Sequence, residues 1–260
     1  METLTLNEAV GKKEKIVGNI QTLNYECPVC RSNYSWGQNK ILKCNKCETV
    51  FIPYINQKIY DKAYTQKYID YKESALNDEL QKIRWENILK NAPKRYKNHL
   101  GDCDSLRLLD YGCGSGAFIE KAPELWDAWG TDINEYSIEY CWNNGLQTLE
   151  LHDAFKATWD VVTMFDVLEH LPNMGVLNEI HSSLHKDGLL IIATPNLTKD
   201  TNLNEWRHFR PQGEHTFCFS KKSIEYLACL YGFTIIDIND NESTVRPPAG
   251  NISTYVLKKN

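Results

Sequence analysis

The sequence predicts an α/β protein with a mostly parallel sheet, preceded by a small cysteine-rich module. From residue 105 onward, short apolar segments alternate with helical segments, and this alternation is typical of a parallel sheet covered on both faces. Upstream, two C-x-x-C pairs punctuate residues 21–54 among short β-like segments. We therefore expect an N-terminal module over residues 1–74 and a larger α/β domain over residues 75–260.

The N-terminal part combines a polar stretch, a row of tyrosines and a helix. Residues 1–20 show no periodicity and are expected to form an extension or a first short strand. Four tyrosines then recur at roughly helical spacing, which we interpret as a surface that docks one module on its neighbour: Tyr60, Tyr64, Tyr68 and Tyr71. Residues 75–99 are expected to form one amphipathic helix, whose apolar stripe comprises Leu76, Leu80, Ile83, Ile88 and Leu89.

The α/β domain is expected to begin with five parallel strands. They are Leu106–Asp110, Ala128–Asp132, Thr148–Leu151, Val161–Phe165 and Leu189–Ala193. Helices are expected near residues 116–125, 135–143, 173–185 and 221–231. Two last strands, Phe233–Ile238 and Ile252–Leu257, have no helix between them and should therefore pair antiparallel.

Composition argues against several classes of protein, although nucleic acid remains a possible partner that is not favoured. The net charge is −5, and no strongly basic stripe of the kind found in generic nucleic-acid-binding proteins is evident. No apolar run approaches the ~20 residues needed to span a bilayer. The first residues lack a basic segment followed by an apolar one, so we expect a cytoplasmic protein without a membrane partner. Nine cysteines, an odd number, argue for metal binding and free thiols rather than a disulfide framework.

A glycine-rich loop marks a candidate cofactor site. Asp110-Tyr111-Gly112-Cys113-Gly114-Ser115-Gly116 follows the first predicted strand and opens a helix, which is the context that a nucleotide-type cofactor requires. Glycines permit a tight turn and a close approach of the backbone to the ligand. The spacing from Gly112 to Ala117 also fits a dinucleotide fingerprint, with Asp132 about 20 residues further on. Two cofactor classes therefore compete for the same loop.

Charge favours S-adenosylmethionine over a dinucleotide. Asp110 would repel the two phosphates of a dinucleotide, whereas S-adenosylmethionine presents an ammonium and a sulfonium cation. The alternative for Asp110 is a cap on the following turn. Asp132 can accept both ribose hydroxyls, and Asp153 can accept the adenine amino group. These three carboxylates end successive predicted strands, at the sheet edge where ligands bind in open α/β folds.

Over about residues 105 to 235 the chain resembles class I S-adenosylmethionine-dependent methyltransferases, in particular the ubiquinone-biosynthesis-like subgroup. The motifs that carry this resemblance are Leu109–Gly116, Asp132, Asp166–Leu171, Gly188–Asn196 and Glu214–Ser220. The resemblance implies a Rossmann-like, seven-stranded methyltransferase fold and S-adenosylmethionine as the methyl donor.

The resemblance also implies roles for individual residues. The glycine loop would hold the methionine part of the cofactor through Asp110, Gly112, Cys113, Gly114 and Gly116. Asp132 and Ile133 would contact the ribose, and Asp153 with Ala154 the adenine. Phe165 and Asp166 would line the floor below the transferable methyl group.

The two cysteine pairs predict a metal site. Cys27 and Cys30 are separated by thirteen residues from Cys44 and Cys47, and two such turns can present four thiolates to one zinc ion. Four protein ligands leave no open position, so the zinc would be structural. Buried thiols or a redox pair are the alternatives. This zinc ribbon is similar to N-terminal modules of methyltransferases associated with sugar and glycan modification, although ribbons also occur in enzymes that act on RNA.

His170 and His215 are the candidate catalytic residues, because histidine titrates near neutral pH and a hydroxyl acceptor benefits from a general base. For His170 a structural hydrogen bond is an equal alternative. Glu169 is a further candidate beside it, and Trp206, His208, Arg210 and His215 could belong to a lid over the acceptor.

We therefore expect methyl transfer to a small-molecule or sugar acceptor, at oxygen. The alternatives are an RNA or other macromolecular acceptor recognised by the ribbon, and a module that binds the cofactor without catalysis. A dehydrogenase is least favoured, because no second substrate domain follows. The sequence does not reveal the oligomeric state.

Overall fold

The computed structural model describes residues 14–17, 20–23, 26–32, 35–36, 42–51, 60–91, 106–203, 205–209, 215–246 and 251–260. The chain divides into two compact units. The first comprises residues 1–56, 169–174 and 195–230, and the second comprises residues 57–168, 175–194 and 231–260. The first unit is thus drawn from three separate stretches, whereas the sequence suggested a single boundary after residue 74.

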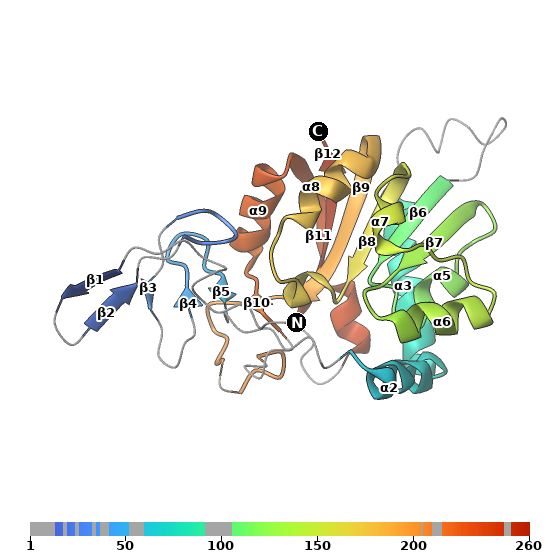
Figure 1. Cartoon of the computed structure of the whole chain (residues 1–260), viewed down its shortest axis with the longest axis horizontal. Coiled ribbons are helices and arrows are strands. Elements are labelled where there is room, and N and C mark those ends of the chain that lie inside the picture. Colours follow the sequence, from blue (N-terminus) through green and yellow to red (C-terminus); the bar gives the residue numbers. More distant parts are fainter. Residues whose placement is uncertain are drawn as a thin grey trace. The chain divides into compact units, whose positions relative to one another are not determined.

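The second unit is built around a six-stranded sheet in the order β11-β12-β9-β8-β6-β7 (Figure 1). Its strands are β6 (Leu106–Tyr111), β7 (Trp126–Thr131), β8 (Trp159–Phe165), β9 (Leu184–Pro195), β11 (Phe233–Asn239) and β12 (Ile252–Lys259). β6 pairs parallel with β7 and β8, and β8 pairs parallel with β9. Every residue of β8 is buried, as expected for a strand covered on both faces. β11 and β12 are antiparallel. The predicted α/β class with a mostly parallel sheet is confirmed.

The third predicted strand, Thr148–Leu151, is wrong. Thr148 makes only an isolated parallel bridge to Gly130, at the edge next to β7. The backbone then turns into helix α7 (Leu151–Ala154), in which the Ala154 amide donates to the Glu150 carbonyl at 3.0 Å. The short apolar pattern could not distinguish a strand from a single helical turn. A one-residue bridge therefore stands where the seventh strand was expected.

Within the described residues, the other helices of the second unit are α2 (Lys62–Lys72), α3 (Ala75–Asn91), α5 (Ala117–Glu120), α6 (Glu135–Asn143) and α8 (Val176–Ser183), with 3₁₀ turns η2 (Leu168–His170), shared with the first unit, and η3 (Asn241–Val245). The expected helix near 116–125 is shorter, because Lys121 ends it two residues before a proline. Residues 92–99, predicted to continue α3, lie outside the described residues.

The buried face of α3 differs from the predicted apolar stripe. Leu80 and Ile88 are buried as expected, but Leu76 is 52% and Leu89 40% exposed. The face instead buries polar residues and one aromatic side chain: Asn77, Gln81, Arg84, Trp85 and Asn87. Trp85 stacks on Phe118 with ring centroids 4.6 Å apart and donates its indole N–H to the Phe118 carbonyl. Apolar periodicity failed here because polar side chains on this face, such as Arg84 and Asn87, pair with polar groups on other elements.

The first unit contains a four-stranded sheet in the order β10-β5-β4-β3. Its strands are β3 (Ser35–Trp36), β4 (Leu42–Lys43), β5 (Val50–Phe51) and β10 (Phe217–Cys218), with a separate hairpin of β1 (Glu14–Val17) and β2 (Ile20–Leu23). Phe51 stacks on Phe217 with ring centroids 4.9 Å apart. Helix α9 (Lys221–Leu230) completes this unit. Among the described residues, no helix is both long and apolar enough to cross a membrane.

Candidate functional site

The glycine loop begins where β6 ends, and its backbone needs glycine at three positions. Gly112, Gly114 and Gly116 have φ of 82°, 53° and 72°, in the left-handed region that side chains disfavour. A Cβ on Gly112 would lie 2.4 Å from a Val167 methyl, whereas a Cβ on Gly114 would meet no atom within 4 Å. The Gly112 amide donates to the Thr131 carbonyl at 2.7 Å, which fastens the loop to β7. The loop therefore packs closely against Val167 at Gly112, whereas Gly114 borders open space.

Asp132 fixes the shape of this loop. Its Oδ2 accepts the Gly114 amide at 2.9 Å, and its Oδ1 accepts the Asn134 amide at 2.8 Å. Burial raises the pKa of this carboxyl. Each oxygen keeps a second lone pair, so the predicted acceptance of ribose hydroxyls is compatible with these bonds. The neighbouring Ile133 side chain is exposed. The ribose contact stays a prediction, and the contact of Asp132 with the loop was not predicted.

Asp110 is a buried carboxylate beside the same loop. Only 4% of the residue is exposed, and the Thr163 hydroxyl on β8 donates to its Oδ1 at 2.6 Å. Burial raises the pKa of Asp110 to about 6. Because burial makes the ionised form of Asp110 unfavourable, a nearby cation would stabilise that form. This electrostatic environment suits a cationic ligand and disfavours a phosphate.

Asp153 has a different environment from the other two predicted carboxylates. It lies in helix α7 rather than at the end of a strand, and its side chain is 44% exposed. Lys156 donates to its Oδ1 at 2.8 Å, and this hydrogen bond lowers the pKa of the carboxyl. Ala154 is fully buried, and its carbonyl accepts the Trp159 indole N–H at 2.7 Å. The proposed adenine contacts of Asp153 and Ala154 stay predictions.

Two arginines hold Asp166, directly after β8. Its φ is 59°, an uncommon left-handed conformation for a residue other than glycine. Arg246 Nη1 and Nη2 each lie 2.8 Å from one of its oxygens, and Arg84 Nη2 lies 2.9 Å from Oδ2. Burial opposes ionisation, but the charges of Arg246 and Arg84 hold the pKa of Asp166 well below its usual range.

The same two arginines also pair with a second carboxylate. Glu242, in η3, is fully buried and accepts from Arg84 Nη2 at 3.1 Å and from Arg246 Nη2 at 2.7 Å. The guanidinium of Arg84 lies 4.2 Å from the centroid of the Phe165 ring. Two positive and two negative groups thus balance each other in a network that includes Asp166, a residue of the predicted floor of the methyl site. Sequence reasoning missed both arginines and Glu242; the one available signal was an arginine on the inner face of α3.

The four cysteines meet in the first unit. Their four sulfur atoms all lie within 4.8 Å of one another. The Sγ atoms of Cys27 and Cys47 are 3.5 Å apart, and so are those of Cys30 and Cys44. Thiolates about 2.3 Å from a zinc ion in tetrahedral geometry stand roughly 3.8 Å apart, so the arrangement fits the ion. The hydrogen bond with Cys27 and burial both raise the pKa of the Cys47 thiol. Four thiolates therefore need a cation in order to coexist here.

Both C-x-x-C turns have the same local geometry. The Cys30 amide points to the Cys27 sulfur and the Cys47 amide to the Cys44 sulfur, each at 3.5 Å. The residue after each pair, Arg31 or Glu48, has a positive φ. Residues that follow β10 anchor the second turn, because the hydroxyls of Ser220 and Ser223 donate to the Cys47 carbonyl at 3.0 and 2.9 Å.

The two candidate catalytic histidines also meet in the first unit. The ring centroids of His170 and His215 are 4.5 Å apart, with the rings nearly perpendicular. His215 is 5% exposed and its Nδ1 lies 2.7 Å from the His208 carbonyl. Glu169 is 2% exposed, and its carbonyl accepts the Thr216 amide at 2.8 Å. The structure thus brings Glu169 together with both histidines; their catalytic role stays a prediction.

Besides His215, two of the predicted lid residues are buried. Trp206 is 9% exposed and packs in a cluster with Val50, Leu197 and Cys218. His208 is 7% exposed. Both therefore contribute to the interior of the first unit, while Arg210 lies outside the described residues.

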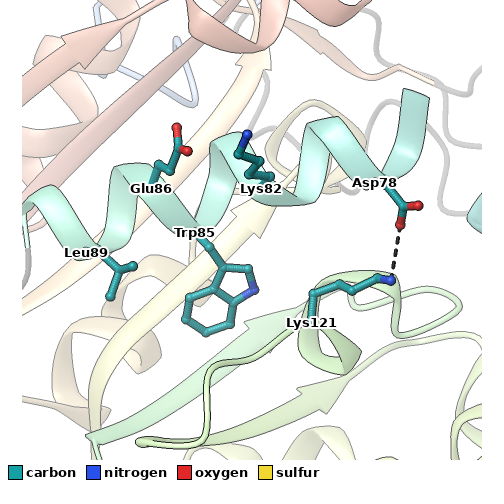
Figure 2. Close-up of a pocket in the computed structure, with 6 residues that line it drawn as sticks. All are labelled: Asp78, Lys82, Trp85, Glu86, Leu89 and Lys121. Atoms are coloured by element: carbon teal, nitrogen blue, oxygen red, sulfur yellow. Dashed lines mark ion pairs between the residues drawn. The ribbon is translucent and has the colours of Figure 1, made fainter. Parts of the chain in front are cut away.

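A surface depression of about 420 Å³ lies beside α3. Figure 2 shows the Trp85 ring projecting from the helix and Lys121 reaching Asp78, with a separation of 3.1 Å between the charged atoms. Glu86, Lys82 and Leu89 complete its lining. None of the predicted cofactor residues lines it, so we assign it no part in the site.

Comparison with known proteins places these features in a wider context. A family model described as "Methyltransferase domain" matches residues 70–238. The chain is 29% identical over 129 residues to the ubiquinone biosynthesis O-methyltransferase of Rickettsia felis, covering 45% of this chain and 51% of that protein. It is 34% identical over 107 residues to the enzyme of the same name from Parvibaculum lavamentivorans, covering 36% and 42%. The chain thus spans about half the length of these curated relatives, or less.

Among solved structures, an S-adenosylmethionine-dependent methyltransferase from Clostridium acetobutylicum aligns with a TM-score of 0.53 and 14% identity. The alignment covers 76% of this chain and 100% of that one. At this identity the likeness shows the fold alone, and it agrees with the sheet described above.

Proposed function

The chain belongs to the methyltransferase-domain family, and from this premise we propose that it transfers the methyl group of S-adenosylmethionine to a hydroxyl of a small molecule or sugar. The family match covers the glycine loop and the sheet that positions it. The observation that carries the choice of cofactor is the buried Asp110 beside the loop, whose pKa of about 6 reflects a site that gains from a cation. S-adenosylmethionine supplies that charge together with the methyl group.

The residues of the second unit would bind and orient the methyl donor. Gly114 offers open space beside the backbone, and Asp132 keeps the loop in position while retaining lone pairs for hydroxyl groups. Arg84 and Arg246 hold the Asp166 carboxylate in one orientation. Hydrogen bonds to protein, rather than to water, would therefore fix its position beneath the donor. Such fixed positioning matters because methyl transfer is an in-line displacement that is accelerated chiefly by alignment.

Oxygen is the proposed acceptor atom. The curated relatives are named as O-methyltransferases, and a hydroxyl must lose its proton during transfer. The hydrogen bond of His215 to the His208 carbonyl, if donated from Nδ1, leaves Nε2 as the basic nitrogen of the neutral ring. His215, with His170 beside it, is therefore our candidate to take that proton as the C–O bond forms and the C–S electron pair goes to sulfur.

We also propose that the four-cysteine cluster holds a structural zinc ion. All four ligand positions are filled by protein, and the sulfur separations fit tetrahedral coordination. The ion would tie together the two turns, the second of which is also held by the hydroxyls of Ser220 and Ser223.

Labelled methyl donor tests the proposed acceptor class. The purified chain is incubated with it and with separated polysaccharide, RNA, protein and small-metabolite fractions, and the methylated atom in the product is then identified by mass spectrometry. We expect O-methyl label in the polysaccharide or small-metabolite fraction. Label confined to RNA or protein would contradict the acceptor class, and N-methyl label would contradict the acceptor atom.

The role of His215 is tested by His215→Ala, with His185→Ala on β9 as the matched control. Turnover should fall in the first variant while S-adenosylmethionine binding persists, and both should be unchanged in the control. An unchanged rate for His215→Ala would remove this residue from the mechanism.

A further inference from the structure

Both C-x-x-C turns continue in the same way along the chain. Two residues after each pair comes a hydroxyl side chain, Ser32 after Cys30 and Thr49 after Cys47. The backbone repeats as well, because the amide of the first cysteine in each turn donates to the carbonyl of that hydroxyl residue, at 2.7 Å in the first turn and 2.9 Å in the second. Ser32 and Thr49 therefore occupy equivalent places beside the four sulfurs.

The Ser32 hydroxyl contacts one sulfur from each turn. Its Oγ lies 2.9 Å from the Sγ of Cys30 and 3.3 Å from the Sγ of Cys44. A cysteine that binds zinc does so as a thiolate, which has no proton to give, whereas a hydroxyl carries one proton that it can donate. With zinc bound, Ser32 would therefore be the donor and either sulfur the acceptor.

Thr49 uses its proton differently, although its place in the second turn is equivalent. Its Oγ1 lies 3.0 Å from the Sγ of Cys47, but its hydroxyl donates to the Oγ of Ser223 in α9 at 2.8 Å. Ser223 in turn donates to the Cys47 carbonyl at 2.9 Å. Because a hydroxyl has a single proton, Thr49 links the second turn to α9 instead of donating to a sulfur.

Charge and exposure give a hydrogen bond from Ser32 a purpose. Four thiolates carry more negative charge than one divalent ion neutralises, so donors to the sulfurs stabilise the loaded site. Cys27, Cys44 and Cys47 are fully buried, whereas Cys30 is partly exposed. Since the thiolate is the form that attacks electrophiles, Cys30 is the ligand at which such a reagent would first open the site. Ser32 makes its shorter sulfur contact with this ligand.

We propose that Ser32 is a positioning residue of the four-cysteine site, whose hydroxyl donates to the metal-bound sulfurs of Cys30 and Cys44. This bond strengthens zinc binding and makes Cys30 less reactive. Thr49 serves to hold α9 and does not act on the sulfurs. The inference rests on the proposed structural zinc ion, whose presence the metal content of the wild-type chain tests by itself.

Co²⁺ is the spectroscopic probe, and the full-length chain is produced in cobalt-supplemented medium so that the ion is incorporated during folding. Ser32→Ala should move the sulfur-to-cobalt charge-transfer band to lower energy, because a sulfur that loses a hydrogen bond gives up an electron more readily. Ser32→Thr, which keeps the hydroxyl, should restore the band. Thr49→Val, the matched variant of the second turn, should leave it in place. A side chain that only supports the fold would not move this band.

Zinc affinity and thiol reactivity give a second measurement. In competition with a chromophoric chelator, Ser32→Ala should bind zinc about tenfold more weakly than the wild-type chain. Iodoacetamide should alkylate Cys30 faster in this variant, with the exposed Cys229 as the internal reference.

Two outcomes would overturn the proposal. An unmoved cobalt band with unchanged zinc affinity in folded Ser32→Ala would refute the role of Ser32 while leaving the zinc site intact. A wild-type chain that contains neither zinc nor cobalt would refute both. Neither measurement uses the methyl donor or an acceptor, so the proposed methyl transfer is not at stake in them.

Discussion

Arg246 contacts both oxygens of Asp166, with its Nη1 and Nη2 each 2.8 Å from one of them. The same guanidinium reaches the buried Glu242 at 2.7 Å. One side chain near the C-terminal end of the chain therefore holds the carboxylate that follows β8 and a second carboxylate in η3. Arg84 repeats both contacts from α3.

Replacing Arg246 by alanine should destabilise the protein by about 3 kcal/mol, because breaking a buried ion pair leaves an uncompensated charge. The cost arises mainly at Glu242, which is fully buried, since Asp166 is 36% exposed and water screens it. Urea denaturation measures the change. Lys121→Ala removes an exposed pair with Asp78 and should cost less than about 1 kcal/mol. Equal losses in the two variants would refute a special role for the arginine network.

Asp110 should make the stability of the protein fall as pH rises from about 4 to 6. Its folded-state pKa of about 6 exceeds the ordinary value of 3.8, so the native state binds more protons than the unfolded state across this interval. The destabilisation is fully developed above pH 6 and amounts to about 3 kcal/mol. Asp110→Asn should abolish this part of the pH dependence, raise the free energy of unfolding at neutral pH and weaken S-adenosylmethionine binding. Denaturation curves at several pH values, with calorimetry of cofactor binding, check each point; a variant with the wild-type pH profile would contradict the assignment.

Asp132→Ala should weaken S-adenosylmethionine binding by roughly 2 to 3 kcal/mol, the worth of hydrogen bonds to a charged group. Two effects combine, because the variant loses the predicted ribose contact and also the bond that orients the Gly114 amide. Asp132→Asn keeps one acceptor oxygen and should lose less. Calorimetry with S-adenosylmethionine and with NAD measures both affinities; binding of NAD alone by the wild-type protein would argue against the cofactor assignment.

Gly112→Ala should be far more damaging than Gly114→Ala. Both positions have positive φ, but only at Gly112 would the new methyl group lie 2.4 Å from Val167. Adding Val167→Ala should recover part of the loss at Gly112 and none at Gly114. A double-mutant cycle on thermal stability measures this coupling. Additive effects of the two substitutions would show that backbone strain alone decides the need for glycine.

Cys44→Ser should lower the zinc content from one ion per chain and destabilise the first unit. Cys229→Ser, at an exposed cysteine of α9, is the matched control and should leave the zinc content unchanged. Metal analysis by mass spectrometry, with far-ultraviolet circular dichroism, makes the comparison. Full zinc content in the Cys44 variant would exclude the four-cysteine assignment.

Much of the sheet could be predicted because its central strands are rich in apolar residues. Val161–Phe165 is buried at every position, and such a run has few alternatives to a central strand. Thr148–Leu151 was wrong because a four-residue apolar pattern equally suits a short helix. The glycine loop, Asp110 and the cysteine pairs were identifiable because their chemistry resides in contiguous motifs.

The ionic network could not be predicted, because its members are far apart in the sequence. Arg84 and Glu242 are separated by 158 residues, and the local sequence around either residue does not predict that the two pair. The same reason explains why the pairing of β5 with β10 was missed: two-residue strands carry almost no periodic signal. Contacts between polar groups that are far apart in the chain could therefore not be predicted, whereas apolar patterns could.

The pairing of β5 with β10 has a consequence for biosynthesis. On the ribosome the cysteine turns emerge early, but the strand that borders β5 and the hydroxyls that hold the Cys47 carbonyl are not translated until residues 217–223. The cysteine-rich region therefore cannot complete its hydrogen bonds as an autonomous first domain, although nascent chains generally fold from the N-terminus. All four thiols of the cluster have therefore been translated by residue 47, long before the strand and the hydroxyls that support the second turn.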